Sequence, residues 1–217
     1  MTESKIDKQT KYLAAVAYGE AGVNYNIKEI TGIAYAVMNR LRAWNKYLVA
    51  KNKKPLTIIQ LFEEDKKYAF ATNGKNVRFN LFQETSDDKI ISDPIFSKVL
   101  EAANNAINCT GIDYSNGAFW WDGKDIFSKY KSHPKVKVGI KFTDPSHNIY
   151  KIKETPKGYI RYVTHIKINK KTKKEEEKKT EIGRHDYIFN STAAHGETIF
   201  WKTDPDYVKL AKALAFR

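Results

Sequence analysis

Apolar residues recur with a helical period on both sides of a short polar turn near the N-terminus. Before the turn, the apolar residues between Tyr12 and Ala17 share one helical face. After it, apolar residues from Ile30 to Leu41 follow the spacing i, i+3, i+4, i+7, i+8, i+11 that is typical of an amphipathic helix. We therefore predict a helix over 7–20, a turn over 21–28 and a second helix from about Ile27 to Trp44.

Three further helices are indicated by capping residues. Thr57 can cap a short helix over Ile58 to Glu64, and Asp93-Pro94 places a capping carboxylate before a proline in the first turn of another. The sequence Thr203-Asp204-Pro205-Asp206 predicts the start of a closing helix.

Alternation of apolar and polar residues predicts β-structure in three places. Aromatic residues on either side of Asn73-Gly74 predict a hairpin over 68–79, in which Phe79 could line a groove. The aromatic run Ala118 to Asp122 is read as a strand. Tyr159 to Ile168 also alternates like a strand, with a charged, solvated tip over 170–179 and a return over 181–189.

Composition excludes several classes of protein. The 217 residues suit one domain, which can bury a core without disulfides; the single cysteine, Cys109, allows no internal disulfide. No apolar run approaches the ~18 residues of a membrane span. The first residues lack the apolar core of a signal peptide. The net charge of +13 predicts an anionic partner, and a nucleic-acid-binding domain is the least favoured reading.

Glu20 is the leading candidate for chemistry. It ends the first predicted helix within Tyr18-Gly19-Glu20-Ala21, where small neighbours leave room for a ligand to approach. The alternative interpretation is a solvated residue at a helix end.

This stretch, with the run from Gly32 to Asn39-Arg40, resembles the cell-wall hydrolase family of spore-cortex-lytic enzymes and the lysozyme-type effectors of type VI secretion systems. The segment Asp113-Tyr114-Ser115-Asn116-Gly117-Ala118 with its following aromatic residues, and the tail from His195 to Trp201, are similar to further elements of that family. Residues 123–190 depart from it.

The resemblance implies an α+β, mainly helical, lysozyme-like fold in one domain over 1–217, with 123–190 as an insertion. It also implies cleavage of the β-1,4 glycan strands of peptidoglycan, with Glu20 as general acid. Such an acid must keep its proton near neutral pH, which burial against apolar helix faces would favour. The expected sugar-binding residues are Tyr18, Phe79, Trp120, Trp121 and Asp122.

The second carboxylate of a hydrolase is assigned to Glu29, at the start of the second helix, with Asp122, Glu84 and Asp125 as further candidates. A lytic transglycosylase would need Glu20 alone, and a glycan-binding module would need no chemistry. No metal is assigned, because His165, His185 and His195 lack ligand spacing. No cofactor is expected.

We expect a monomer that acts on peptidoglycan in the periplasm or cell wall, carried there by a secretion system or as part of a longer protein. An immunity protein is the expected protein partner, and no nucleic-acid partner is expected.

Overall fold

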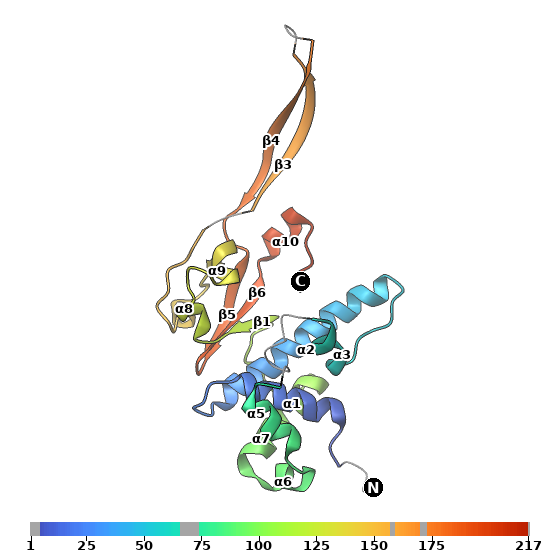
Figure 1. Cartoon of the computed structure of the whole chain (residues 1–217), viewed down its shortest axis with the longest axis vertical. Helices are drawn as coiled ribbons and strands as arrows, with labels where there is room; N and C mark the ends of the chain where they lie inside the picture. The colour runs from blue at the N-terminus through green and yellow to red at the C-terminus, as the bar shows by residue number, and fades with distance from the viewer. Residues whose placement is uncertain (1–4, 66–73, 157–158, 170–172, 217) are drawn as a thin grey trace.

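The apolar pattern at the N-terminus forms two packed helices in the computed structural model, which describes residues 5–65, 74–156, 159–169 and 173–216 (Figure 1). Helix makes up 46% and strand 20%, so the expected α+β, mainly helical class is confirmed. Among the described residues, no helix is long and apolar enough to cross a bilayer.

Side-chain caps define the starts of the first two helices. Asp7 accepts a hydrogen bond from the Thr10 amide at the start of α1 (Lys8–Glu20), and Asn26 caps α2 (Ile27–Ala50). The second helix extends six residues beyond the predicted end at Trp44. Tyr47, in this extension, packs against Phe216 with ring centroids 5.9 Å apart, so a tertiary contact stabilises the extra turns.

In the described residues between 58 and 108, four more helices follow, and α1, α2, α5 and α7 pack around a shared apolar core (Figure 1). The predicted helix at Thr57 is confirmed with a full capping box. The helix at Asp93-Pro94 is confirmed as well, and its proline occupies the first turn. The bounds are α3 (Ile58–Glu64), α5 (Val77–Glu84), α6 (Asp87–Ser92) and α7 (Pro94–Asn108).

The predicted hairpin over 68–79 is wrong where the structure describes it. Residues 68–73 lie outside the described residues, but residues 77–79 belong to α5, which Asn76 caps by accepting from the Phe79 amide at 3.1 Å. Of the aromatic residues that suggested alternation, Phe79 lies in the described part, where it is buried in the core together with Phe82 of the same helix. Helical packing against α1 therefore overrides the local β pattern.

A small mixed sheet lies beside the helices, with the strand order β1-β6-β5-β2. The strands are β1 (Trp120–Asp122), β2 (Ile140–Lys141), β5 (Phe189–His195) and β6 (Thr198–Thr203). Phe200 of β6 packs directly on α2 at Gly32, where a Cβ atom would lie 2.6 Å from the ring. The predicted aromatic strand is confirmed as β1, which pairs with β6 so that Trp120 faces Trp201 across the ladder.

Two short helices, α8 (Asp125–Ser128) and α9 (Pro134–Val138), follow β1 and cover one side of the sheet (Figure 1). Ile126 and Val136 anchor them in a second apolar cluster with Ile140, Ile199 and Trp201. A 3-10 turn, η2 (Pro145–His147), comes later in the same region.

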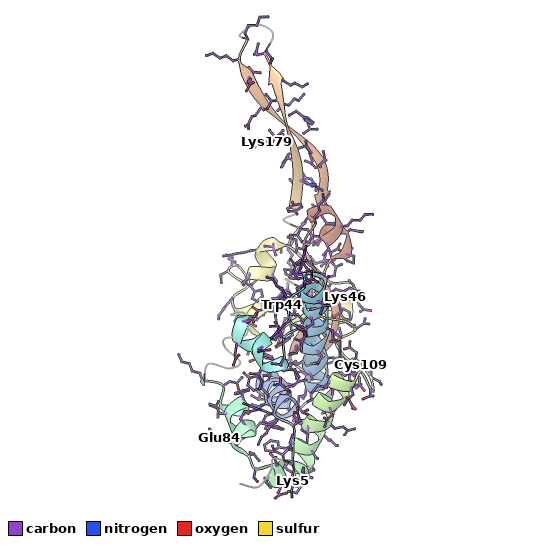
Figure 2. All side chains as sticks on the ribbon, turned by 90° about the vertical axis from the view of Figure 1, so that its right-hand side faces the viewer. Lys5, Trp44, Lys46, Glu84, Cys109 and Lys179 are labelled. Atoms are coloured by element: carbon purple, nitrogen blue, oxygen red, sulfur yellow. The ribbon has the colours of Figure 1, made fainter. Side chains whose placement is uncertain are left out.

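The predicted strand over Tyr159–Ile168 is confirmed as β3, which pairs with β4 (Glu175–His185) to form a long two-stranded arm. Both views show the arm projecting away from the rest of the chain (Figures 1 and 2), and Figure 2 labels Lys179 near its middle. The charged tip is shorter than predicted, because residues 175–179 are paired in β4.

The closing helix is confirmed as α10 (Pro205–Ala211), capped by Asp204.

Candidate active site

Glu20 lies at the C-terminal end of α1, where two neighbours hold the chain in position. Gly19 permits a close approach by Asn76, because a Cβ atom at Gly19 would lie 2.9 Å from the Asn76 side chain. Asn76, itself buried as the cap of α5, donates a hydrogen bond to Glu20 Oε1 at 3.3 Å. Arg78 donates to the carbonyls of Ala21 and Gly22, each at 2.7 Å, and so fixes the turn that follows.

Glu20 opens into a pocket of about 950 Å³ between the end of α1 and the segment that follows β1. This volume lies toward the upper end of the usual range for ligand pockets. The described residues that line it are Glu20, Trp120, Trp121, Asp122, Gly123, Lys124, Asp125, Lys129, His133, Pro134, Lys135, Val138 and Phe189.

Burial raises the pKa of the Glu20 carboxyl above its usual value, and the nearby Asp125 carboxylate raises it further. Hydrogen bonds from Trp121 and Asn76 oppose this shift without cancelling it. Removal of water from around the carboxyl is therefore the main cause. A carboxyl with a raised pKa on a pocket wall can serve as a proton donor.

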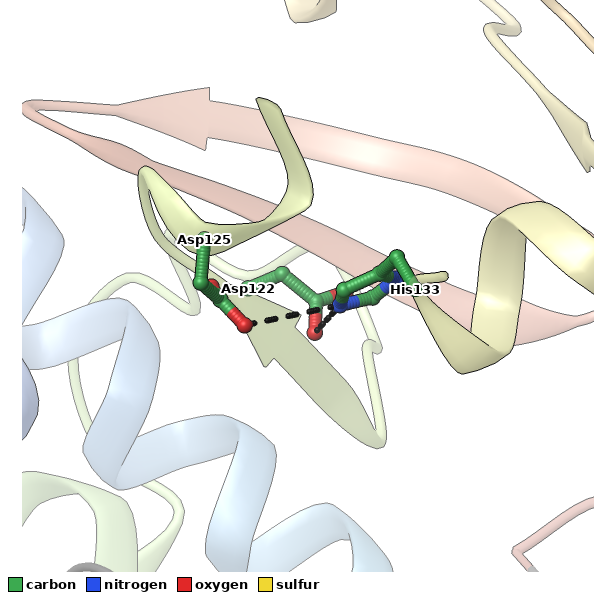
Figure 3. Close-up of side chains that lie close together, drawn as sticks. All are labelled: Asp122, Asp125 and His133. Carbon is green, nitrogen blue, oxygen red and sulfur yellow. Dashed lines mark ion pairs between the residues drawn. The ribbon is translucent and has the colours of Figure 1, made fainter. Parts of the chain in front are cut away.

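A row of alternating charges lies in the same pocket (Figure 3). Lys135 Nζ lies 2.8 Å from Asp122 Oδ2, and His133 Nε2 lies 3.3 Å from Asp122 Oδ1 and 3.6 Å from Asp125 Oδ2. His133 is only 5% exposed. The imidazole thus lies between two carboxylates, one of which is also paired with a lysine.

Burial alone would lower the pKa of His133, but hydrogen bonds to Asp122 and Asp125 outweigh it and raise the pKa to about 9. In turn, the hydrogen bond from His133 lowers the pKa of Asp125 below its usual value. At neutral pH, His133 is therefore an imidazolium beside the Asp125 carboxylate. The pKa of the neighbouring Glu20 carboxyl is shifted in the opposite direction to that of Asp125.

Asp122, Asp125 and His133 are also the described residues best placed to hold a metal ion, since their ligand atoms lie within 4.8 Å of one another. A metal would have to displace the His133 proton and compete with the Lys135 ammonium for Asp122. The two carboxylates are already balanced by two cationic groups, and we treat the group as an ion-pair row.

Glu29 does not line this pocket. Its side chain is 1% exposed, and its Oε1 accepts hydrogen bonds from the amides of Gly22 and Glu197 and from Thr198 Oγ1, at 3.1, 3.2 and 2.7 Å. Glu29 therefore ties the turn between α1 and α2 to the turn between β5 and β6. Glu84 is exposed at the end of α5 and does not line the pocket either (Figure 2).

Two of the expected sugar-binding residues face elsewhere. Tyr18 packs against Phe82 and Phe96, with Arg78 over its ring at 4.1 Å. Phe79, expected in a groove-lining hairpin, is buried behind Gly19. Neither contributes to the described pocket lining, because the end of α1 directs Glu20 and Tyr18 to different sides.

The aromatic strand β1 places the remaining expected sugar-binding residues at the pocket. Trp121 is half-buried and hydrogen-bonds Glu20. Trp120 is 7% exposed and stacks under the guanidinium of Arg40, 3.7 Å from the ring centroid. Asp122 follows at the end of the strand. The structure therefore brings Glu20, Trp120, Trp121, Asp122 and Asp125 together.

The motif residues of the central helix have structural contacts in this chain. Asn39 donates to Asp113 at 2.9 Å, and Asp113 accepts from Ser115 and Gly117. Arg40 is buried and ion-paired with Asp65. The hydrogen bonds of Asp113 fix the loop before β1, and so they help to position Trp121 and Asp122.

Sequence reasoning missed Asn76, His133 and Lys135. Asn76 was hidden by the incorrect hairpin prediction, although Asn before an apolar run is also a helix-cap signal. His133 and Lys135 lie in the segment that departs from the resembled family. The only signal was local: two aspartates three residues apart after an aromatic strand, and then a histidine before Pro134.

Comparisons of this chain with protein-family models, with curated proteins and with solved structures found no match.

Proposed function

We propose that this protein cleaves the β-1,4 glycan strands of peptidoglycan in a lysozyme-like domain, with Glu20 as general acid. The observation that carries the proposal is the Glu20 carboxyl itself. It is half-buried at the wall of a wide pocket, and its pKa is raised mainly by this loss of contact with water. A glycosidic oxygen leaves poorly unless it is protonated, and a carboxyl that keeps its proton can protonate it.

The pocket also suits an anionic sugar polymer. Trp121 offers an aromatic ring next to Glu20, and such rings stack on the apolar faces of sugars. Lys124 and Lys129 are exposed at the pocket, where they can attract the carboxylates of the stem peptides. The net charge of +13 supports the same class of partner.

The proposed activity implies a site of action in the periplasm or cell wall, reached through a secretion system or as part of a longer protein. A cell that produces such an enzyme would need an immunity protein for protection, and this is the proposed protein partner.

The first test replaces Glu20 by Gln, which keeps the shape of the side chain but removes the transferable proton. We expect clearing of purified sacculi to slow by ~10²–10⁴-fold while the fold is kept. The matched control is Glu63→Gln, the same change at an exposed position of α3 outside the pocket, which should clear at the wild-type rate.

A folded Glu20→Gln variant that clears sacculi as fast as wild type overturns the proposal. Wild-type protein that sediments with sacculi without clearing them identifies a glycan-binding module instead.

Lytic transglycosylation is the second candidate. The position of Glu29, outside the pocket, favours this reaction over hydrolysis with Glu29 as the second carboxylate. The glutamate expected to assist hydrolysis is buried and engaged in three hydrogen bonds outside the pocket. Glu20 could then act alone, with the sugar 6-hydroxyl as nucleophile. Mass spectrometry separates the two reactions, because anhydro-muramic products are lighter than hydrolysed ones by one water.

A further inference from the structure

Two carboxyl groups from distant parts of the chain line the same pocket and differ in their surroundings. Glu20 lies at the end of α1 beside Trp121 and Asn76. Asp125 comes from the first turn of α8, and its side chain is 52% exposed. Glu20 is flanked by these two neutral side chains. Asp125 lies at the exposed end of the ion-pair row, next to His133.

Asp122 and Asp125 are unequal members of that row. The Asp122 side chain is 10% exposed; both of its carboxylate oxygens lie within 3 Å of Lys135 Nζ, and Oδ1 also faces His133. Among the described residues, Asp125 has one ion pair, at 3.6 Å to His133 (Figure 3), and its half-exposed side chain lines the pocket. Asp125 is therefore the carboxylate that a substrate or water molecule can reach.

We propose that Asp125 is the general base that activates the attacking water, and that His133 is its positioning residue. This inference rests on the proposed glycan cleavage, and it makes the enzyme a hydrolase. It also replaces Glu29 as the partner of Glu20.

The reaction balances with these two groups and one water. Glu20 gives its proton to the glycosidic oxygen, and the bond from C1 to that oxygen breaks with its electron pair going to the oxygen. Asp125 takes a proton from water, and the water oxygen forms the new bond to C1. Glu20 ends as a carboxylate and Asp125 as an acid, and exchange of one proton with solvent restores both.

His133 stabilises the anionic form of Asp125, while the surroundings of Glu20 favour the protonated form of its carboxyl. Its imidazole is nearly fully buried and lies between the two aspartates, so it places a fixed positive charge next to Asp125 in the pocket wall. The lowered pKa of Asp125 and the raised pKa of Glu20 agree with this division of roles.

The first experiment compares wild type with Asp125→Asn and Asp125→Ala on purified sacculi. We expect hydrolysed, reducing-end products from wild type, and a ~10²–10⁴-fold lower kcat/KM for both variants. Sodium azide should restore turnover of Asp125→Ala and leave a glycosyl azide, detectable by mass, because a small anionic nucleophile needs no base. The matched control is Asp88→Asn, which changes an exposed aspartate of α6 outside the pocket and should leave the rate at the wild-type value.

The second experiment tests His133 through its effect on pH dependence. In His133→Gln, the acid limb of kcat/KM, which reports the general base, should move to higher pH because the cation next to Asp125 is lost. The other charged groups around Asp125 are Lys129, Lys135 and Glu20, and those around His133 are Asp122 and Lys135; all of them are kept in this variant. A merely structural role would lower the rate without moving that limb.

Several outcomes overturn the inference without affecting the role of Glu20. Anhydro products from wild type are one, and an Asp125→Asn variant as fast as wild type is another. Direct attack by water inverts C1 and gives the α-anomer first, so a β-anomer as the first product also overturns the inference. Loss of activity on treatment with EDTA would also overturn it. Failure of the proposed function looks different, because there the wild type would not cleave sacculi or Glu20→Gln would remain active.

Discussion

Glu20 and Glu29 stand nine residues apart and show how surroundings assign different roles to the same side chain. Glu29 is buried, but hydrogen bonds from two turns and a threonine hydroxyl satisfy its carboxylate. Gly196, in a left-handed conformation at φ +58°, lies so close that a Cβ atom there would meet Glu29 Oε2. Glu20 has fewer donors and an open pocket beside it. Of these two glutamates, Glu20 is the one that is partly shielded from water and also lines the pocket.

At the same scale, the His133 ion pairs predict how stability depends on pH. The folded-state pKa of about 9 lies above the ordinary histidine value of 6.5, so the folded protein binds more protons between these values. The stabilisation is complete below about pH 6.5 and is lost as pH rises through 9. We expect the melting temperature to fall across this window, by about 2–4 °C for each kcal/mol lost in a chain of this size.

Thermal melts of wild type and His133→Gln between pH 6 and 10 check this prediction. The variant should be less stable at pH 6 and should lose less stability than wild type as pH rises. Parallel curves for the two proteins would show that folding does not raise the pKa of His133.

At the scale of elements, the arm formed by β3 and β4 is attached only near its base in the described structure. Arg161 donates to the Leu210 carbonyl at 3.1 Å, Tyr159 packs on Tyr207, and Gly183 lies against the Leu210 side chain. From Tyr162 outward the side chains are mainly exposed, Ile166 and Ile168 among them. An isolated two-stranded ribbon has little stability of its own, so the outer arm adds little to the fold.

We therefore expect that replacing residues 164–179, between the paired Val163 and Thr180, with an Asn-Gly turn changes the melting temperature by no more than a few degrees. The matched control is Arg161→Ala in the full-length arm, which breaks the contact with α10 and should cost more stability than the shortening. Calorimetry of both variants decides the point, and a large loss from the shortened arm would show that its outer part is packed.

The elements also show which parts of the fold the sequence could predict. Periodicity and caps predicted α1, α3, α7, β1, β3 and α10 well, because each carries its own local signal. The hairpin prediction over 68–79 failed in its described part because Phe79 belongs to α5, a helix that packs against α1. The extra turns of α2 were missed because their support comes from Phe216, far along the chain.

The candidate site was predictable to a similar extent. Glu20, Trp121, Asp122 and Asp125 could be named from the sequence, since they lie in or beside recognisable motifs. The distribution of charge among them could not, because it depends on His133 and Lys135, which reach Asp122 and Asp125 only through the fold. Glu29 was assigned to the cleft from its spacing alone, and its three hydrogen bonds became visible only in the structure.

For the whole molecule, the net charge of +13 is the property most directly linked to an anionic polymer. Part of it lies at the pocket, on Lys124 and Lys129, and part on the arm, on residues such as Lys167 and Lys178. All four side chains are exposed, so salt can screen them. The two locations allow local attraction at the site to be separated from general attraction to the wall.

Binding to sacculi should therefore weaken as salt rises, because exposed charges are screened beyond about 8–10 Å at 0.1–0.15 M ionic strength. Cosedimentation of Glu20→Gln with sacculi measures binding without cleavage. In that background, loss of one carboxylate raises the formal net charge from +13 to +14. Lys124→Gln with Lys129→Gln and Lys167→Gln with Lys178→Gln each then reduce the net charge by two, to +12. If the pocket lysines contact the stem peptides, the first pair should bind more weakly and with a smaller salt dependence than the second. Equal binding of the two pairs would assign the attraction to net charge, and binding unaffected by salt would assign it to stacking and hydrogen bonds.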